Sequence, residues 1–294
     1  MSEDLQRHAR SFGGVADAYD RGRPSYPDAA VAWLVGDRPV TVLELGAGTG
    51  KLTARLLAAG HDVHATEPDE SMLEVLRRRL PDVRTSATGA EEIPVADQSV
   101  DVVVAAQCLH WFDAERALPE IARVLRPGGH LAAVWNERDE RIPWVRKLGR
   151  VIGTQDVLSD PMAAVVGSDD FHDVDDAAFK HWQVVDRRSI QDLVRSRSDV
   201  AVLGEAERAR VLADVLALYD DYGRGMDGMQ LPYQARCFRA RVTERVAPPA
   251  PEPTFEPTVP ISLAGDDPFV DSADTIPRVA AGLEDTGTLL IDFR

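Results

Sequence analysis

The sequence has few cysteines, little positive charge and no long hydrophobic run. Its two cysteines, Cys108 and Cys237, are too few for a disulfide framework, and neither belongs to a C-x-x-C pair that could bind zinc. No apolar segment approaches the roughly 18 residues of a membrane-spanning helix, and the polar N-terminus lacks a signal-peptide core. These absences predict a cytoplasmic protein with no metal site and no membrane partner.

The shortage of positive charge narrows the class of ligand. The 294 residues include 33 Lys and Arg against 49 Asp and Glu, a net charge of −16. Nucleic acids and anionic membranes are bound by clustered basic side chains. The composition therefore favours a small-molecule substrate over a nucleic acid, and it gives no indication of the oligomeric state.

Residues 40–136 alternate between short β-rich runs and helical patterns. Strands are expected at residues 40–45, 62–66, 83–86, 100–106 and 130–135, and helices at 49–58, 70–80 and 115–125. Ser71 and Glu74 have capping-box spacing, and residues 126–129 (RPGG) resemble a helix stop followed by a turn. Strands separated by helices of this length predict a doubly wound α/β fold with a parallel sheet.

The remainder of the chain divides into two further parts. Helices are expected at residues 141–155 and 205–219, and strands at 179–185 and 229–242. Residues 248–260 contain six prolines, and acids predominate from there to the end, which predicts a disordered tail with an optional strand at 288–293. We therefore expect a cap segment (1–35), a nucleoside-binding core (36–140), C-terminal strands with a substrate-side cap (141–246) and an acidic tail (247–294).

The most informative segment is residues 42–53, VLELGAGTGKLT. An expected strand ends in a glycine-rich turn, Gly46, Gly48 and Gly50, which opens into an expected helix. Glu67 ends the next expected strand, 21 residues after Gly46. This order is the first half of a nucleoside-binding sheet. Glycines allow close approach of a ligand to the backbone, and the Glu67 carboxylate can accept two hydrogen bonds from ribose hydroxyls.

The spacing of the turn indicates which nucleoside it binds. It is G-x-G-x-G, whereas pyrophosphate-binding turns have G-x-G-x-x-G. Glu44, just before the turn, opposes a pyrophosphate but suits a ligand that carries an ammonium or a sulfonium. The pattern resembles motif I of the class I S-adenosylmethionine (SAM) dependent methyltransferases, which have a Rossmann-like, mostly parallel seven-stranded sheet with helical cap elements. The resemblance implies that cofactor contacts come from Glu44, Gly46, Ala47, Gly48, Gly50, Glu67, Pro68 and Met72.

Two later segments resemble the same family. Residues 88–103 resemble the stretch between strands three and four, where an acid and an alanine contact adenine; Gly89 occupies the place of the acid, so these contacts fall to the Ala90 backbone and Glu91. At the end of strand four, the resemblance places Gln107 beside the methionine part of SAM. His110 is the candidate catalytic residue for proton transfer and Trp111 a candidate substrate contact; the alternative is that both pack under the next helix.

The N-terminal segment 12–27 resembles the leader of methyltransferases related to trans-aconitate methyltransferase, the type 11 group. Tyr19 and Arg23 match positions that cover SAM in that group; the alternative is a capping helix on the sheet. Arg197, Tyr233 and Arg236 match elements that would flank the acceptor pocket. Structural ion pairs are the alternative role for each arginine.

The preferred function is methyl transfer from SAM to an oxygen, or a nitrogen or carbon, of a small molecule such as a carboxylic acid or a secondary metabolite. Two alternatives remain. One is a SAM-binding but catalytically silent interaction protein, which the exchange at Gly89 favours. The other is an NAD(P)-dependent oxidoreductase, which lacks support because both the pyrophosphate-binding turn and a Tyr-x-x-x-Lys pair are missing.

Overall fold

The computed structural model describes residues 16–153, 161–222 and 228–243. Internal contacts divide the chain into Met1–Val246, which contains all of these residues, and Ala247–Arg294. The expected acidic tail and its optional strand at 288–293 lie outside the described residues, as do residues 12–15 of the leader. The division of the first 246 residues into cap, core and substrate-side parts stays a prediction.

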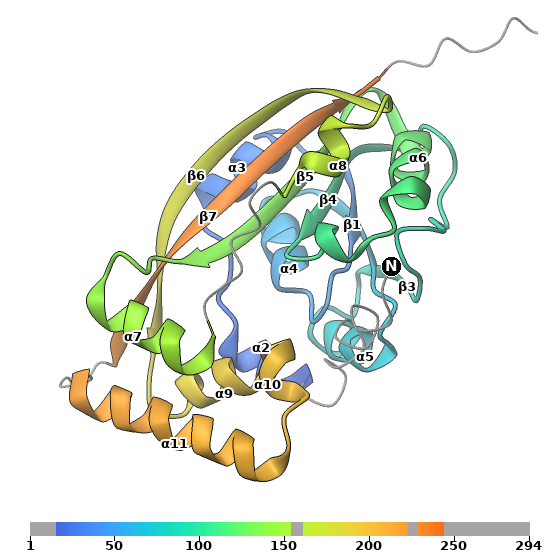
Figure 1. The fold of residues 1–294 in the computed structure, drawn as a ribbon. Helices are drawn as coiled ribbons and strands as arrows, with labels where there is room; N and C mark the ends of the chain where they lie inside the picture. The colour runs from blue at the N-terminus through green and yellow to red at the C-terminus, as the bar shows by residue number, and fades with distance from the viewer. Residues whose placement is uncertain (1–15, 154–160, 223–227, 244–294) are drawn as a thin grey trace, which may run out of the picture. The chain divides into compact units, whose positions relative to one another are not determined.

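Seven strands of the described residues form one sheet in the order β3-β2-β1-β4-β5-β7-β6 (Figure 1). Their bounds are β1 Thr41–Leu45, β2 Asp62–Thr66, β3 Arg84–Ser86, β4 Val100–Ala106, β5 Leu125–Arg138, β6 Phe171–Val185 and β7 Met229–Val242. Strands β1 to β5 are parallel, and β7 runs antiparallel between β5 and β6. The expected doubly wound, mostly parallel seven-stranded fold is confirmed.

Helices cover both faces of this sheet and the end at which β1 and β4 finish (Figure 1). They are α2 Ala16–Gly22, α3 Asp28–Val35, α4 Lys51–Ala58, α5 Glu70–Arg79, the 3-10 helix η2 Leu109–Trp111, α6 Ala114–Val124, α7 Pro143–Ile152, α8 Ala163–Val166, α9 Ser189–Arg195, α10 Ser198–Ala201 and α11 Glu205–Tyr222. Val42 of β1 packs with Leu52 and Leu56 of α4 on one face, and Leu43 packs with Ile121 of α6 on the other. Because both faces of the inner strands are buried, β1 and β4 are almost continuously apolar.

The start of α5 differs from the expected capping box. The N-cap is Asp69, whose Oδ1 accepts hydrogen bonds from the backbone N–H of Ser71 at 3.0 Å and of Met72 at 3.3 Å. The assignment of the cap to Ser71 with Glu74 is therefore wrong. An aspartate in extended conformation immediately before the helix satisfies the first backbone donors.

Strands β5 and β6 are longer than expected. The pairing of β5 with β4 passes from Val100–Leu125 to Val102–His130, so the expected RPGG turn is an irregular excursion within β5. Strand β6 begins at Phe171, and its pairing with β7 is irregular between His172 and Asp175. Residues 172–176 (HDVDD) are exposed and mostly acidic. The sequence there lacks the alternation of apolar and polar residues that predicts a strand.

Candidate functional site

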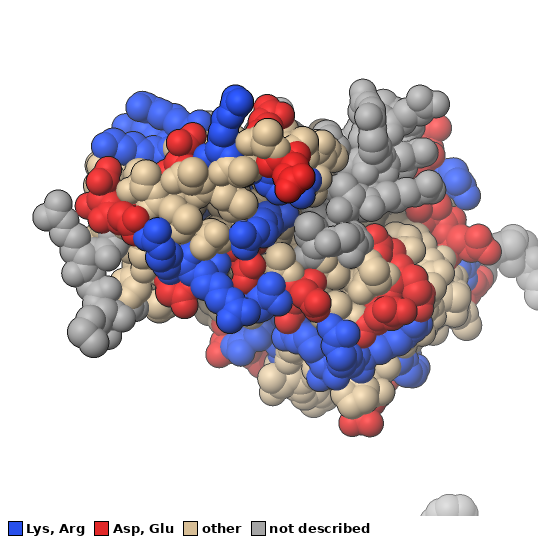
Figure 2. All heavy atoms as spheres, turned by 90° about the horizontal axis from the view of Figure 1, so that it is seen from below, with Lys and Arg blue, Asp and Glu red and all other residues tan. Residues whose placement is uncertain are grey.

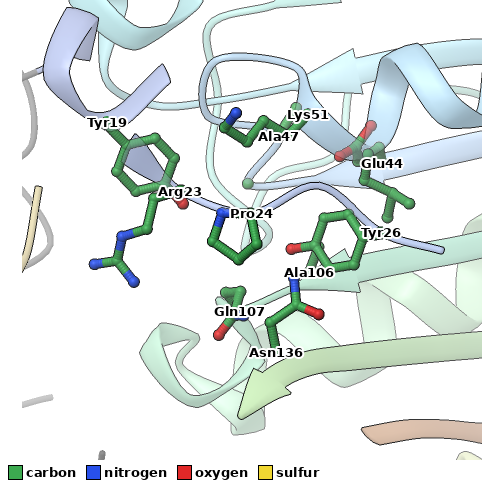
Figure 3. Close-up of a pocket in the computed structure, with 12 residues that line it drawn as sticks. Tyr19, Arg23, Pro24, Tyr26, Glu44, Ala47, Lys51, Ala106, Gln107 and Asn136 are labelled. Carbon is green, nitrogen blue, oxygen red and sulfur yellow. The ribbon is translucent and has the colours of Figure 1, made fainter. Parts of the chain in front are cut away.

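A cavity lies at the carboxyl ends of β1, β4 and β5, where open α/β sheets bind ligands. It is lined by Tyr19, Arg23, Pro24, Tyr26, Glu44, Gly46, Ala47, Lys51, Leu52, Ala106, Gln107 and Asn136. In Figure 3, Pro24 lies between Arg23 and Tyr26, and the side chains of Gln107 and Asn136 lie below it. The structure thus brings six of the expected residues together: Tyr19, Arg23, Glu44, Gly46, Ala47 and Gln107.

The three glycines of the turn between β1 and α4 are required for different reasons. All three have positive φ angles: 66° at Gly46, 57° at Gly48 and 81° at Gly50. A Cβ on Gly46 would lie 2.7 Å from Cys108 Sγ, and one on Gly50 would lie 2.9 Å from Leu76 Cγ. A Cβ on Gly48 would meet nothing closer than 4.0 Å. The nearest atoms, Met72 Cε and Tyr19 Cε1, are at ordinary contact distance, so Gly48 is the least crowded glycine of the turn, as expected where a ligand approaches the backbone.

The Glu67 carboxylate fixes this turn to the end of β2. Its Oε2 accepts from the backbone N–H of Gly48 at 2.9 Å, and its Oε1 accepts from that of Asp69 at 3.0 Å. Burial raises the pKa of Glu67, and the two backbone donors partly offset this shift. Each carboxylate oxygen has a second lone pair, so Glu67 can still accept two hydrogen bonds from a ligand. Two neighbours of Glu67 were also expected to bind cofactor: Pro68 is exposed, whereas Met72 is buried beside Tyr19.

Glu44 lies deep in the cavity wall. The residue is 1% exposed, and its Oε2 accepts from Thr53 Oγ1 at 2.6 Å. Burial raises the pKa of Glu44 to about 8, the Thr53 hydroxyl opposes the shift, and the negative charge of Glu67 adds to it. A carboxyl group of this kind is largely protonated at neutral pH and can become a counter-charge for a cation that enters the cavity.

Gln107 and Asn136 line the cavity from the ends of β4 and β5. Gln107 has a φ of 64°, a conformation that is uncommon for a residue with a side chain and that is frequent at functional sites. Asn136 Oδ1 accepts from His181 Nε2 at 2.8 Å, and the ring of His181 stacks on Tyr233 at a centroid distance of 5.4 Å. A contiguous polar chain therefore joins the cavity to Tyr233 on β7.

Tyr19 and Arg23 cover the cavity from α2 and the segment that follows it. Arg23 donates from Nε to Ser196 Oγ at 2.9 Å and from Nη2 to the Ser196 carbonyl at 3.0 Å, and its guanidinium lies 5.2 Å from the centre of the Tyr19 ring. Burial raises the pKa of Tyr19. The segment is a capping helix that also contributes side chains to the cavity, and the role of Tyr19 and Arg23 in covering SAM stays a prediction.

The expected adenine contacts lie beyond the cavity lining. Ala90 is 3% exposed and belongs to the core. Glu91 Oε1 accepts from the backbone N–H of Asp113 at 2.9 Å, and a Cβ on Gly89 would lie 2.6 Å from Glu91 Oε2. The glycine at position 89 therefore leaves room for a carboxylate that supports the turn before α6.

His110 and Trp111 lie in η2, directly after β4. The two rings are 4.6 Å apart, and Trp135 Nε1 donates to His110 Nδ1 at 3.5 Å. Desolvation lowers the pKa of His110 to about 4, although the residue keeps an exposed edge, so its imidazole is neutral at physiological pH. His110 also borders a second, mainly apolar cavity of about 250 Å³ between η2, α6 and α8.

None of the expected acceptor residues Arg197, Tyr233 and Arg236 lines the cavity. Arg197 pairs with Asp199 at 2.9 Å, and Arg236 pairs with Glu137 at 3.1 Å. Burial raises the pKa of Tyr233 to about 12, while the positive charges of Arg138, Arg23 and Arg197 oppose this shift. Arg236 therefore has the structural ion pair that was its alternative role, and Arg197 combines an ion pair with proximity to Tyr233.

Sequence reasoning missed several residues that line the cavity. Lys51 follows the glycine turn directly, and burial lowers the pKa of its ammonium group while Asp20 opposes the shift. Tyr26 lies within the leader motif, but only Tyr19 and Arg23 were selected there. Asn136 is a polar residue at the carboxyl end of a buried strand, and that position could have identified it.

Two features are absent from the parts of the chain that the structure describes. No group of three or more His, Cys, Asp and Glu side chains is placed to hold a metal ion. None of the described helices combines the length and the hydrophobicity needed to traverse a lipid bilayer.

Comparison with known proteins yields methyltransferases. Residues 43–133 match a family described as a methyltransferase domain. An uncharacterized methyltransferase of Mycobacterium tuberculosis is 45% identical over 233 residues, which are 78% of this chain and 95% of the relative. An uncharacterized methyltransferase-like protein of Schizosaccharomyces pombe is 35% identical over 236 residues, 76% of this chain and 92% of the relative.

Two further similarities are more limited. A malonyl-[acyl-carrier protein] O-methyltransferase of Methylococcus capsulatus is 38% identical over 133 residues, 42% of this chain and 48% of that protein. A solved structure described as a type II methyltransferase from Anaeromyxobacter dehalogenans has a TM-score of 0.54 and 27% sequence identity, and the match covers 74% of this chain and 97% of that one.

Proposed function

The chain belongs to the family of class I SAM-dependent methyltransferases, and we propose that it binds SAM in the cavity below α2 and methylates an oxygen of a small carboxylic acid. The observation that carries the proposal is the Gly48 turn. The Cα of Gly48 is the least crowded of the three glycines, and Glu67, whose oxygens can accept further hydrogen bonds, holds the turn at the carboxyl ends of β1 and β2.

The residues present fit SAM as the methyl donor. Glu67 would hold the ribose, the backbone at Gly46, Ala47, Gly48 and Gly50 would support the amino-acid part, and Glu44 would face its positive charge. The remaining proposed cofactor residues are Tyr19, Arg23, Pro68, Met72, Ala90, Glu91 and Gln107. Ionisation of Glu44 is favoured by a cation in the cavity, since the charge of its carboxylate is otherwise buried.

SAM supplies a methyl group that is already activated by a positively charged sulfur. The chain's own residues have to align the acceptor and exclude water. Tyr19 and Arg23 do so by covering the cavity from α2, and Gln107 holds a polar side chain at the end of β4. A carboxylate acceptor needs no base; for a hydroxyl acceptor, neutral His110 is the candidate proton acceptor, with Trp111 beside it.

Three observations support an acidic acceptor. The positive charges of Arg23, Arg138 and Arg197 all act on the Tyr233 hydroxyl, although the chain as a whole is acidic. Arg23 donates hydrogen bonds to Ser196 and has no acidic partner among the described residues. The Methylococcus relative is named as an O-methyltransferase that acts on a malonyl group. We assign Arg197, Tyr233 and Arg236 to the acceptor side, with Arg138 added.

The test is methyl transfer from radiolabelled SAM into a panel of mono-, di- and tricarboxylic acids, followed by mild alkali. A methyl ester releases its label as methanol, whereas methyl ethers, N-methyl and C-methyl products keep it. Label that resists alkali would contradict the carboxylate assignment. SAM binding without transfer to any acceptor in a cell extract would instead favour the catalytically silent alternative.

A further inference from the structure

Strand β6 forms an edge of the sheet. It spans 15 residues and pairs with β7 on one side, and no other described strand pairs with its second side. The pairing with β7 is regular from Asp175 to Val185. An edge of this length presents a row of backbone N–H and C=O groups that can pair with another strand.

One face of this edge carries exposed apolar side chains. Trp182 is 60% exposed and Val184 is 61% exposed. Because alternate residues of a strand share a face, they lie with Ala178, Lys180 and Asp176. The opposite face is covered: its His181 stacks on Tyr233. An exposed apolar surface beside an open strand edge indicates an interaction surface.

The order of side chains along β6 is complementary to itself. When two copies of β6 run antiparallel about a twofold axis at Ala178, Asp176 of each copy lies opposite Lys180 of the other. Trp182 of each copy then lies just outside the regularly paired residues, near the start of β6 in the other copy, where Val174 is itself 38% exposed. In this register an even-numbered residue always pairs with an even-numbered one, and an odd with an odd. Paired side chains therefore point to the same face of the sheet, and the backbone groups that point away from β7 in one copy meet those of the other.

Neighbouring registers lose this complementarity. An axis one residue later, at Phe179, places Asp176 opposite Trp182, and an axis at Lys180 places two lysines opposite each other. Like charges in directly opposite positions destabilise a strand pair, whereas opposite charges and apolar pairs stabilise it. The charges therefore select one register, and they disfavour indiscriminate pairing of the edge.

We propose that the chain forms a twofold homodimer in which the β6 edges of two copies pair antiparallel about Ala178. The two sheets then continue into each other, and both copies contribute the same surface, as a twofold axis requires. The irregularity between His172 and Asp175, where Asp173 has a φ of 50°, limits the regular new ladder to residues 175–181. The inference is independent of the proposed methyl transfer.

The test is the mass of the full chain in solution by light scattering and sedimentation over a concentration series. We expect about 64 kDa, twice the 32.2 kDa of one chain. Lys180→Asp and Asp176→Lys should each raise the dimer dissociation constant at least about tenfold, and the double variant should restore it to within about threefold. Arg210→Asp, on an exposed position of α11, changes the net charge as Lys180→Asp does and should leave the dimer intact.

Circular dichroism of each variant checks that the monomer remains folded, which the exposure of both side chains leads us to expect. A monomer at about 100 μM would overturn the proposal. A dimer that responds equally to all four variants, or that the double variant fails to restore, would also overturn it, because it would then form through another surface.

Discussion

Glu44 and Glu67 are buried carboxyl groups at neighbouring strand ends, and their hydrogen-bond partners differ. Glu67 accepts from two backbone N–H groups, which stabilise its ionised form. Glu44 accepts from the Thr53 hydroxyl in the core, and burial raises its pKa to about 8. Burial raises the pKa of both groups, but the backbone donors at Glu67 suit it to further hydroxyl donors, whereas Glu44 is suited to a cation.

The raised pKa of Glu44 predicts a pH-dependent cost to stability. Because the folded-state pKa lies above that of the unfolded chain, the folded protein retains a proton that the unfolded chain loses. Stability should fall between about pH 5 and 8 by about 1.4 kcal/mol per pH unit from this group. Glu44→Gln cannot ionise, so its unfolding free energy should increase relative to wild type as pH rises.

Chemical denaturation at pH 5.5, 6.5 and 7.5 measures this difference. Glu115→Gln, at an exposed position of α6, is the matched control and should follow the wild type at every pH. A constant difference between Glu44→Gln and wild type across this range would show that Glu44 is ionised in the folded protein.

The lowered pKa of His110 predicts its behaviour in catalysis. An imidazole with a pKa of about 4 is neutral from pH 5.5 to 8, so the rate of methyl transfer should show no inflection near 6.5. With a carboxylate acceptor, His110→Gln should keep turnover within about tenfold of wild type, because loss of a true general base typically costs 10²–10⁴-fold. A loss in that range with unchanged SAM affinity would assign proton transfer to His110.

At the scale of elements, the contact between α2 and α9 joins the cover of the cavity to the acceptor side. A Cβ on Gly22 would lie 2.3 Å from the backbone nitrogen of Leu193, so the two helix backbones touch directly. Arg21 Nε donates to Asp192 Oδ2 at 2.8 Å, and Gln183 Nε2 donates to the Gly22 carbonyl at 2.8 Å. Helix α9 thereby positions the helix that carries Tyr19.

Gly22→Ala should separate these helices and weaken cofactor binding at a distance. The added methyl group meets backbone atoms that cannot rotate away, and overpacking of this kind costs about 1–3 kcal/mol of stability. SAM affinity measured by calorimetry should fall roughly tenfold, since Tyr19 and Arg23 move with α2. Gly204→Ala, where a Cβ meets nothing within 4 Å, is the control. Equal affinities in both variants would refute this coupling.

Elements whose residue pattern and bordering turn residues are both visible in the sequence could be predicted. Strand β4 at Val100–Ala106 and strand β7 at Met229–Val242 have the expected bounds, because their apolar runs are bordered by turn residues. The short helices α9 and α10 lack such a signal in the sequence. They depend on contacts with α2, α7 and α11, which a local pattern does not reveal. The excursion at residues 126–129 is recognised only from its pairing with β4.

The candidate site was predictable where residues are close in sequence. The glycine turn, Glu44 and Glu67 form one motif with a characteristic spacing. Asn136 was missed although its place at the end of β5 could have identified it. Arg138 could not be selected, because it lies three residues beyond the expected end of β5 and its charge acts on Tyr233 of β7, which is distant in sequence. Convergence of residues that are distant in sequence depends on the sheet order, which composition and periodicity do not specify.

At the scale of the whole molecule, the charge distribution favours a small ligand over a large polyanion. The net charge is −16, and Figure 2 shows Lys and Arg side chains interspersed with Asp and Glu on the face seen from below. Acidic side chains lie among the basic ones on the visible part of that face, whereas nucleic acids are bound by clustered basic side chains. The absence of a nucleic-acid partner stays a prediction. The arginines around Tyr233 can attract an acid locally, whereas the acidic molecule as a whole repels polyanions.

The central claim is that Glu67 holds the ribose of SAM and that the Gly48 turn supports its amino-acid part. Calorimetric titration of the purified chain with SAM and with NAD, repeated with Glu67→Ala, tests it most directly. We predict one SAM bound per chain, no NAD binding, and an affinity for SAM lower by about 2–4 kcal/mol in the variant, roughly 30- to 1,000-fold. Equal SAM affinity in wild type and variant, or uptake of NAD in place of SAM, would contradict the account.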